Sequence, residues 1–218
     1  MITIPLREAL RVLVVTDAQL AAPRSVTEVV RATLEAGARS VQMRNKGDSA
    51  RALAELGREL RTLTREHGAL LFVNDRVDLA LAVEADGVHV GPQDLPVAAV
   101  RSITPPGFLV GRSADDPGVA LRAVAEGADY IGCGTVYATT TKADAGKVIG
   151  LEGLAAVARA VPVPVVAIGG ITVERAGEVV PTGAAGVAVV GAVMSAADPG
   201  EAVRRLLRAL RDIASRIV

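Results

Sequence analysis

The sequence contains no tryptophan, one cysteine, two phenylalanines and two tyrosines. Such a chain has little material for the aromatic platforms on which single-stranded nucleic acids stack, and we expect no nucleic-acid partner. Cys133 has no second cysteine to pair with, which excludes an intramolecular disulfide and a multi-cysteine zinc site and favours a reducing compartment. With so few aromatic rings, the core must consist of Val, Ile, Leu and Ala.

Neither sign of charge is in excess, because 24 Lys and Arg residues are balanced by 24 Asp and Glu residues. This balance excludes a basic protein that coats polyanions, and the 50% apolar content excludes a disordered chain. The apolar run at 12–15 is too short for a signal peptide. The longest uncharged stretch, 179–197, is interrupted by Pro181 and glycines, so we interpret it as buried wall and expect no membrane partner. We expect a cytoplasmic protein.

Short apolar runs alternate with segments of helical spacing along the 218 residues. Eight runs are the expected strands: 12–15, 40–43, 70–73, 87–90, 108–110, 130–132, 163–168 and 186–190. The helical spacing is clearest at 26–36, 49–66, 118–126, 151–160 and 201–213, and weakest at 77–83. Parallel strands need helix-length connections, so this alternation predicts an α/β fold, and eight repeats favour a closed (β/α)8 TIM barrel. Without a linker or low-complexity tract, residues 1–218 should form a single domain.

Polar residues gather directly after the apolar runs. In a parallel barrel these positions converge on the carboxyl-terminal face, where barrel enzymes build their sites. Gln42, Arg44 and Lys46 are spaced by two, so an extended strand end would project all three to one side. Arg44 and Lys46 could instead be solvated loop charges, but Gln42 is a polar residue inside an apolar run, which counts against that alternative.

Two carboxylates follow neighbouring strands, in Asn74-Asp75 and at Asp94. Each could instead cap a helix, since Asp75 precedes the segment 77–83 and Asp94 precedes a helix that could begin near Pro96. As a pair facing a basic cluster, they suit Mg²⁺, which takes one or two protein carboxylates and completes its shell with water and phosphate oxygens.

Hydroxyls, an amine and glycines follow the last three strands. The segment 134–150 combines small residues with Thr139, Thr141 and Lys142, which can donate to phosphate oxygens. A bland polar loop is the alternative, and the glycines and small residues of 135–150 make that stretch a plausible lid. The pairs Gly169-Gly170 and Val190-Gly191 follow strands seven and eight, where backbone amides at helix starts favour an anion.

The remaining candidates for chemistry favour structural roles. His67 lies before Gly68 at an expected helix end, which is a capping position. His89 lies within a strand, where we expect a packed or hydrogen-bonded side chain, and Cys133 is expected in the core. With two histidines and one cysteine, a zinc hydrolase or a Ser-His-Asp enzyme finds little support.

Taken in order, these motifs resemble the thiamine-phosphate synthase family, and the resemblance covers almost the whole chain. It rests on 41–46 (VQMRNK), 73–78 (VNDRVD), 86–96 (DGVHVGPQDLP), 110–113 (VGRS), 139–142 (TTTK) and 167–171 (AIGGI). The resemblance implies a barrel enzyme that condenses 4-amino-2-methyl-5-hydroxymethylpyrimidine diphosphate with 4-methyl-5-(2-phosphoethyl)thiazole. The products would be thiamine phosphate and pyrophosphate.

The resemblance also implies roles for individual residues. Asp75 and Asp94 would hold Mg²⁺ on the diphosphate, and the catalytic residues would be Arg44, Lys46, Ser113 and Lys142. Gln42, Asn74 and Ser113 would contact the pyrimidine diphosphate. The thiazole phosphate would bind at Thr139, Thr141, Gly169, Gly170, Val190 and Gly191.

Elementary chemistry is compatible with these roles. An aminopyrimidine can donate electron density to a benzylic-type cation, so pyrophosphate could leave before the thiazole nitrogen attacks. The protein would then neutralise the leaving charge and position the nucleophile, with no strong general base required. Three positions depart from the family pattern: Ala114-Asp115 after the Gly-x-Ser turn, Ala138 where proline is common, and Gly191 where serine is common.

Three other functions compete with the synthase. A thiazole tautomerase of the same fold needs an acid or base, which Asp115 or Asp116 would have to supply. A non-catalytic phosphate-sensing barrel would keep the glycine turns but does not need paired carboxylates, and a sugar-phosphate epimerase would want metal-binding histidines that this chain lacks. A homo-oligomer is compatible with all of these readings.

Overall fold

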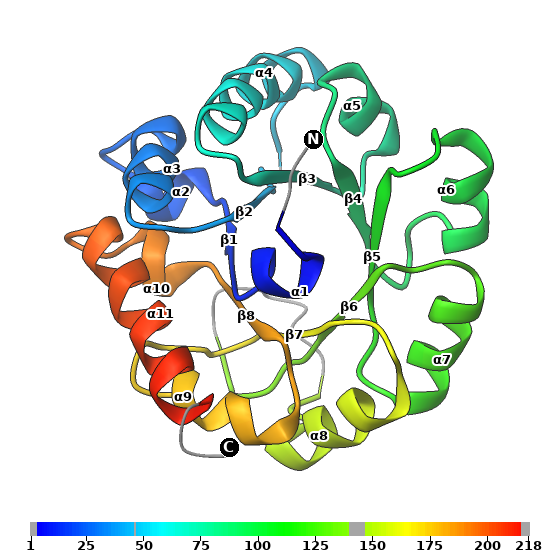
Figure 1. Ribbon diagram of the computed structural model, residues 1–218. Helices are drawn as coiled ribbons and strands as arrows, with labels where there is room; N and C mark the ends of the chain where they lie inside the picture. Colours follow the sequence, from blue (N-terminus) through cyan, green and yellow to red (C-terminus); the bar gives the residue numbers. More distant parts are fainter. Residues whose placement is uncertain (1–3, 46, 140–146, 215–218) are drawn as a thin grey trace.

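Eight parallel strands close into a barrel in sequence order, with helices around the outside (Figure 1). The computed structural model describes residues 4–45, 47–139 and 147–214. The strands are β1 Val12–Val15, β2 Ser40–Met43, β3 Leu70–Asn74, β4 Gly87–Val90, β5 Leu109–Ser113, β6 Tyr130–Cys133, β7 Val165–Ala167 and β8 Gly186–Val189. Pairing of β1 with both β2 and β8 closes the ring. The predicted (β/α)8 TIM barrel is therefore confirmed.

The helices of at least six residues are α3 Val26–Glu35, α4 Ala50–Glu66, α5 Val77–Ala82, α6 Val97–Ile103, α7 Pro117–Ala125, α8 Gly150–Ala160 and α11 Pro199–Ala214. The shorter ones are α1 Leu6–Ala9, α2 Ala18–Ala21, α9 Ala176–Val179, η1 Val180–Thr182 and α10 Gly191–Met194. The structure confirms the helices predicted from spacing, to within a few residues at their ends. The helices of four residues or fewer went unpredicted, because one turn is too short to show a helical period.

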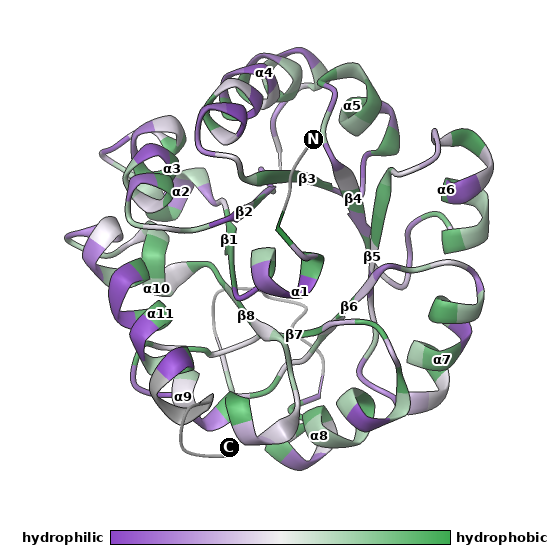
Figure 2. Cartoon of the chain, in the orientation of Figure 1, coloured by the Kyte–Doolittle hydropathy of each residue, from purple (hydrophilic) through white to green (hydrophobic). Residues whose placement is uncertain are grey.

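The sequence forms these helices through local signals and one apolar face. Ser25 and Glu28 make a capping box at the start of α3, in which each side chain bonds the other residue's backbone N–H. Figure 2 shows hydrophilic and hydrophobic stretches alternating around the outer helices, as expected when one face packs on the sheet. The main core of Val, Leu and Ala lies in this layer between sheet and helices.

A second, smaller core fills the inside of the barrel. It contains Leu13, Phe72, Tyr130 and Val166, and α1 packs against it. Helix α1 lies across the barrel opening in Figure 1, so the amino-terminal ends of the strands are covered. The carboxyl-terminal ends are left to carry loops.

Two strand boundaries differ from the predictions. The strand predicted at 108–110 is β5, which continues to Ser113 and so places Arg112 and Ser113 in the sheet rather than after it. The strand predicted at 163–168 is shorter, because Pro164 has no N–H for the ladder and β7 begins at Val165. None of the described helices is long and apolar enough to cross a membrane. The predicted domain boundaries, 1–218, stay a prediction.

Candidate active site

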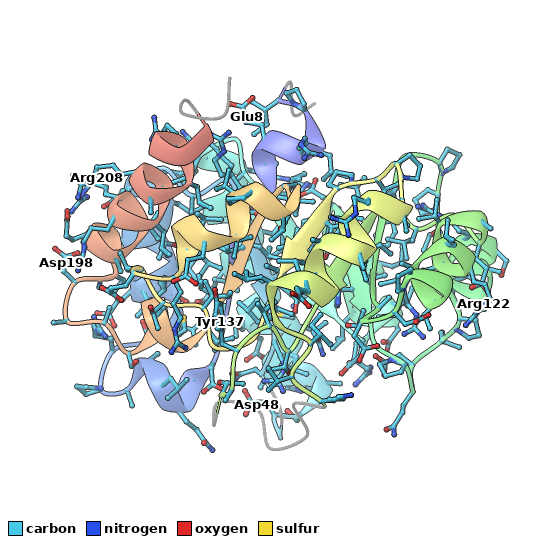
Figure 3. The ribbon with its side chains drawn as sticks, turned by 90° about the horizontal axis from the view of Figure 1, so that it is seen from below. Glu8, Asp48, Arg122, Tyr137, Asp198 and Arg208 are labelled. Atoms are coloured by element: carbon cyan, nitrogen blue, oxygen red, sulfur yellow. The ribbon has the colours of Figure 1, made fainter. Side chains whose placement is uncertain are left out.

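The loops after the strands meet at the end of the barrel opposite α1. Figure 3 shows Glu8 of α1 at one end of the molecule, Asp48 at the opposite end, and Tyr137 in the half nearer to Asp48. Asp48 lies between β2 and α4, and Tyr137 lies between β6 and α8. The predicted rim is therefore where the chain places its strand-to-helix loops.

A pocket of about 300 Å³ lies on this rim where the β2–α4 and β3–α5 loops meet. Apolar and polar residues line it together, and Arg44, Asn74 and Asp75 are among the polar ones. The other lining residues are Met43, Asn45, Gly47, Asp48, Leu53, Val73, Arg76 and Leu79. Three of the predicted substrate and metal residues thus line one pocket.

Asp75 and Asp94 occupy tight turns after β3 and β4. Asp75 has φ 57°, in the left-handed region that Asp and Asn tolerate better than most residues, and its Oδ2 accepts from Asn74 Nδ2 at 2.9 Å. Asp94 Oδ2 accepts the Gly91 N–H at 2.6 Å. The N-cap residues of α5 and α6 are Arg76 and Pro96, so the alternative in which these aspartates cap helices is wrong.

The carboxylates do not form a protein-only metal cage. Among the described residues there is no group of three or more His, Cys, Asp or Glu side chains that could hold a metal ion. Two carboxylates on adjacent turns instead match the donor set of Mg²⁺, which relies on water and substrate phosphate for its other ligands. The residues present therefore fit a magnesium ion that binds together with a diphosphate.

Arg44 is held by its backbone while its side chain remains available. Its N–H donates to Thr16 Oγ1 at 2.9 Å, and the buried Thr16 hydroxyl donates in turn to the Arg44 carbonyl at 3.2 Å. Within the described part of the chain, the Arg44 guanidinium makes no hydrogen bond or ion pair. The predicted partner cation, Lys46, lies outside the described residues.

Gln42 and Ser113 point into the barrel below the rim. Gln42 is 5% exposed, and its side chain faces the buried Tyr130 phenol, whose pKa it acts to lower. Ser113 Oγ lies 2.9 Å from His89 Nε2, and His89 Nδ1 lies 3.0 Å from the Tyr130 hydroxyl. The expectation of a hydrogen-bonded His89 is confirmed, whereas its contact with the predicted substrate residue Ser113 went unpredicted.

The glycine pair after β7 lets two loops meet backbone to backbone. Tyr137 N donates to the Gly169 carbonyl at 3.0 Å. Gly170 has φ 63°, and a Cβ there would lie 2.7 Å from the carbonyl oxygens of Tyr137 and Ala138. Only glycine fits this approach, which brings the Gly169-Gly170 turn beside the segment leading to Thr139. Thr141 and Lys142 lie outside the described residues.

Side chains reinforce the contact between these two loops. The Tyr137 hydroxyl donates to Glu178 Oε2 at 2.8 Å, and the Arg175 guanidinium lies 4.7 Å from the Tyr137 ring centroid. Arg175 Nη1 also donates to the Gly170 carbonyl at 3.3 Å. Desolvation, together with the Glu178 carboxylate, raises the pKa of Tyr137 to about 12, so its phenol stays protonated near neutral pH.

Val190 and Gly191 supply backbone groups only, as the sequence indicated. Val190 is the N-cap residue of the short helix α10, and its carbonyl accepts from Val193 and Met194. The N–H groups of Gly191 and Ala192 find no acceptor in the described part of the chain. Both amides are therefore available for a ligand.

The expectations for His67 and Cys133 are confirmed. His67 is the C-cap residue of α4, and its Nδ1 lies 2.9 Å from the Leu63 carbonyl. Cys133 is a buried free thiol, and burial raises its pKa to about 12, which leaves it protonated and unreactive.

Comparisons with known proteins agree with this geometry. The family model described as thiamine monophosphate synthase matches residues 12–193. A thiamine-phosphate synthase from Moorella thermoacetica is 49% identical over 193 residues, which is 88% of this chain and 92% of the relative. One from Pyrococcus furiosus is 47% identical over 208 residues, which is 95% of this chain and 98% of the relative.

Solved structures give the same result. A thiamine phosphate pyrophosphorylase from Pyrococcus furiosus superposes with a TM-score of 0.89 at 45% identity, covering 96% of this chain and 99% of that one. A 3-hexulose-6-phosphate synthase, at 21% identity and a TM-score of 0.66, shares the fold alone. The chain is thus an α/β barrel enzyme, with its candidate site on the carboxyl-terminal rim. It belongs to the thiamine monophosphate synthase family, and the prediction of a transferase in thiamine biosynthesis is confirmed.

Proposed function

We propose that this enzyme joins 4-amino-2-methyl-5-hydroxymethylpyrimidine diphosphate to 4-methyl-5-(2-phosphoethyl)thiazole, giving thiamine phosphate and pyrophosphate. The observation that carries the proposal is the rim pocket, in which a guanidinium, an amide and a carboxylate line one opening, at Arg44, Asn74 and Asp75. A diphosphate needs cationic donors, and a metal bound with it needs carboxylate oxygens. Family membership supports the same substrates.

We propose that pyrophosphate leaves before the new bond forms. Asp75 and Asp94 would hold Mg²⁺, which supplies charge neutralisation to the diphosphate when bound. The Arg44 guanidinium, with no partner in the described part of the chain, would contact the leaving group, and Lys46 and Lys142 would add charge. Asn74, Gln42 and Ser113 would orient the pyrimidine, because their polar side chains lie at the ends of β3, β2 and β5.

The second substrate would bind on the opposite side of the rim. The amides of Gly191 and Ala192 have no acceptor in the described part of the chain and can donate to a phosphate. Gly169 and Gly170 bring the neighbouring turn close to Thr139, and Thr141 belongs to the same predicted set. The thiazole nitrogen carries no proton to lose, so this side needs donors rather than a general base.

The tautomerase alternative loses one of its two candidate bases. Asp116 is the N-cap residue of α7, and its Oδ1 accepts the N–H groups of Gly118 and Val119 at 2.8 and 3.1 Å. A carboxylate whose oxygen already accepts two backbone N–H groups at a helix start is poorly placed to move a proton. Only the exposed Asp115 would remain.

The test is pyrophosphate release from the purified protein with both substrates present. We expect release that requires Mg²⁺ and stops after EDTA treatment, with little release when the thiazole phosphate is omitted. Isomerisation of a thiazole phosphate without pyrophosphate release would support the tautomerase instead. Binding of both phosphates without turnover would support the phosphate-sensing barrel. The cytoplasmic location and a homo-oligomeric state stay predictions.

A further inference from the structure

Two side chains inside the barrel connect Gln42 to Ser113 and have no role in the function proposed above. Tyr130 of β6 faces the Gln42 side chain, and its hydroxyl lies 3.0 Å from His89 Nδ1. His89 Nε2 lies 2.9 Å from Ser113 Oγ. The series Gln42, Tyr130, His89 and Ser113, which we call the interior chain, crosses the barrel from β2 to β5.

The barrel makes room for the two rings with glycines. A Cβ on Gly111 would lie 2.1 Å from Tyr130 Cζ, and a Cβ on Gly132 would lie 2.8 Å from His89 Cε1. Phe72 packs edge-on against Tyr130 with 5.2 Å between ring centroids. The surrounding atoms therefore fix the positions of the Tyr130 and His89 rings. The hydrogen bond between the two side chains follows from this packing of the barrel interior.

The hydrogen bonds have a direction. The Tyr130 hydroxyl is buried, and burial raises its pKa, so the phenol keeps its proton and needs an acceptor for it. The Tyr130 O–H then donates to His89 Nδ1, which leaves the imidazole proton on Nε2. That N–H donates to Ser113 Oγ, so the Ser113 hydroxyl hydrogen is directed away from His89.

We propose that His89 and Tyr130 are positioning residues that hold Ser113 as a hydrogen-bond donor to the pyrimidine diphosphate. The inference rests on the proposed function, because it takes Ser113 and Gln42 as contacts of that substrate. Neither His89 nor Tyr130 has to touch the substrate. Instead, they would act on the substrate through the orientation of Gln42 and Ser113, the two side chains that would contact it.

The first test reads the imidazole directly and needs no catalysis. The chain has two histidines, so the variant His67→Gln leaves His89 as the only source of imidazole signals in a ¹⁵N NMR spectrum. We expect the neutral ring to carry its proton on Nε2, and the preference to weaken in Tyr130→Phe, which keeps the ring and removes the hydroxyl. A proton on Nδ1 would overturn the inference.

The second test separates the two substrates. Tyr130→Phe and His89→Gln should raise KM for the pyrimidine diphosphate by about tenfold, the effect of one hydrogen bond, and leave KM for the thiazole phosphate unchanged. His89→Gln should retain more activity than His89→Asn, because only the longer amide can reach Ser113. The matched control is His67→Gln, which makes the same substitution at a helix end remote from the site.

Coupling to Ser113 decides between positioning and general stability. Added to Ser113→Ala, the change Tyr130→Phe should cause no further rise in KM, because the group that it positions is already gone. Independent, multiplicative losses, or equal rises in KM for both substrates, would overturn the inference. Failure of the proposed function would give a different result. The unmodified protein would release no pyrophosphate, while the NMR spectrum would still show the His89 proton on Nε2.

Discussion

Charged side chains at the two ends of the barrel make different kinds of contact. At the amino-terminal end, Asp86 precedes β4, pairs with Arg61 at 2.7 Å and accepts the N–H of Leu71 at 2.8 Å. Asp129 repeats the arrangement before β6, pairing with Arg101 and accepting the N–H of Val110. In each case the aspartate ties a helix to the edge shared by two strands.

The carboxyl-terminal rim uses its charges differently. Asp94 accepts one backbone N–H, Asp75 turns in the left-handed region, and the Arg44 guanidinium has no partner in the described part of the chain. The backbone shapes these turns, and the Arg44 guanidinium remains available to a ligand. One end of the barrel therefore uses charge for stability, and the other should use it for binding. Substitutions at the two ends should separate these effects.

The largest effect is expected from Asp75→Asn. Asparagine tolerates the same left-handed backbone and keeps an acceptor for Asn74, so the turn should survive while the charge is lost. We expect turnover to fall about 100- to 1000-fold, as for loss of a group that stabilises charge in the transition state. Mg²⁺ titrations of activity and denaturant unfolding are the two measurements. A large loss of stability would mean that the rim carboxylate serves the fold as well.

The opposite outcome is expected from Asp86→Asn. The substitution leaves Arg61, whose side chain is 15% exposed, beside a neutral amide. Removing one partner of a largely buried pair should lower the free energy of unfolding by about 2–3 kcal/mol, somewhat less than for a fully buried pair. Glu201→Gln, in an exposed ion-pair network, should leave the free energy of unfolding almost unchanged. If Asp86→Asn instead lowered kcat of the folded protein, the contrast between the two ends would fail.

Much of the fold was predictable because apolar runs and helical spacing alternate eight times. The predicted strand bounds were least accurate at β7 and β5. Pro164 removes a ladder donor before β7, and the polar residues Arg112 and Ser113 continue β5. The strand continues there because its neighbours β4 and β6 supply partners on both sides. Tertiary pairing of this kind is not visible in a local pattern.

The rim residues of the candidate site were also predictable, since strand ends converge by topology alone. The interior chain was not, because it depends on which residues face the barrel axis. Its signal lies in alternate positions of three consecutive strands, where Gly87 and His89, Gly111 and Ser113, and Tyr130 and Gly132 combine small and polar residues. That pattern indicates an interior contact only when the register of the strands is known, because the register places each glycine beside an aromatic or imidazole ring.

A smaller effect is expected from Arg175→Ala. The side chain stacks on Tyr137 and bonds the Gly170 carbonyl, but it is exposed to solvent. We expect KM for the thiazole phosphate to rise about threefold, in keeping with an exposed cation–π contact. KM for the pyrimidine diphosphate should not move. Arg205→Ala, which removes an exposed ion pair with Glu174, is the control and should change neither KM.

The smallest effect should come from Asp78→Asn, in the first turn of α5, where the carboxylate forms an exposed ion pair with Arg76 of the β3–α5 loop. The hydrogen bond from Arg76, at 2.5 Å, lowers the pKa of Asp78 from its ordinary 3.8, against the opposing effect of desolvation. A lowered pKa in the folded state means that the pair stabilises the protein above pH 3.8 and that this contribution is lost as the pH falls below it. The Asp78 side chain is 65% exposed, so the contribution should be only a few tenths of a kcal/mol.

Asp78→Asn should therefore unfold slightly more easily than the unmodified protein at pH 7, and the difference should shrink as the pH is lowered toward 3. A loss at pH 7 as large as that of Asp86→Asn would show that rim charges stabilise the fold as much as those at the amino-terminal end.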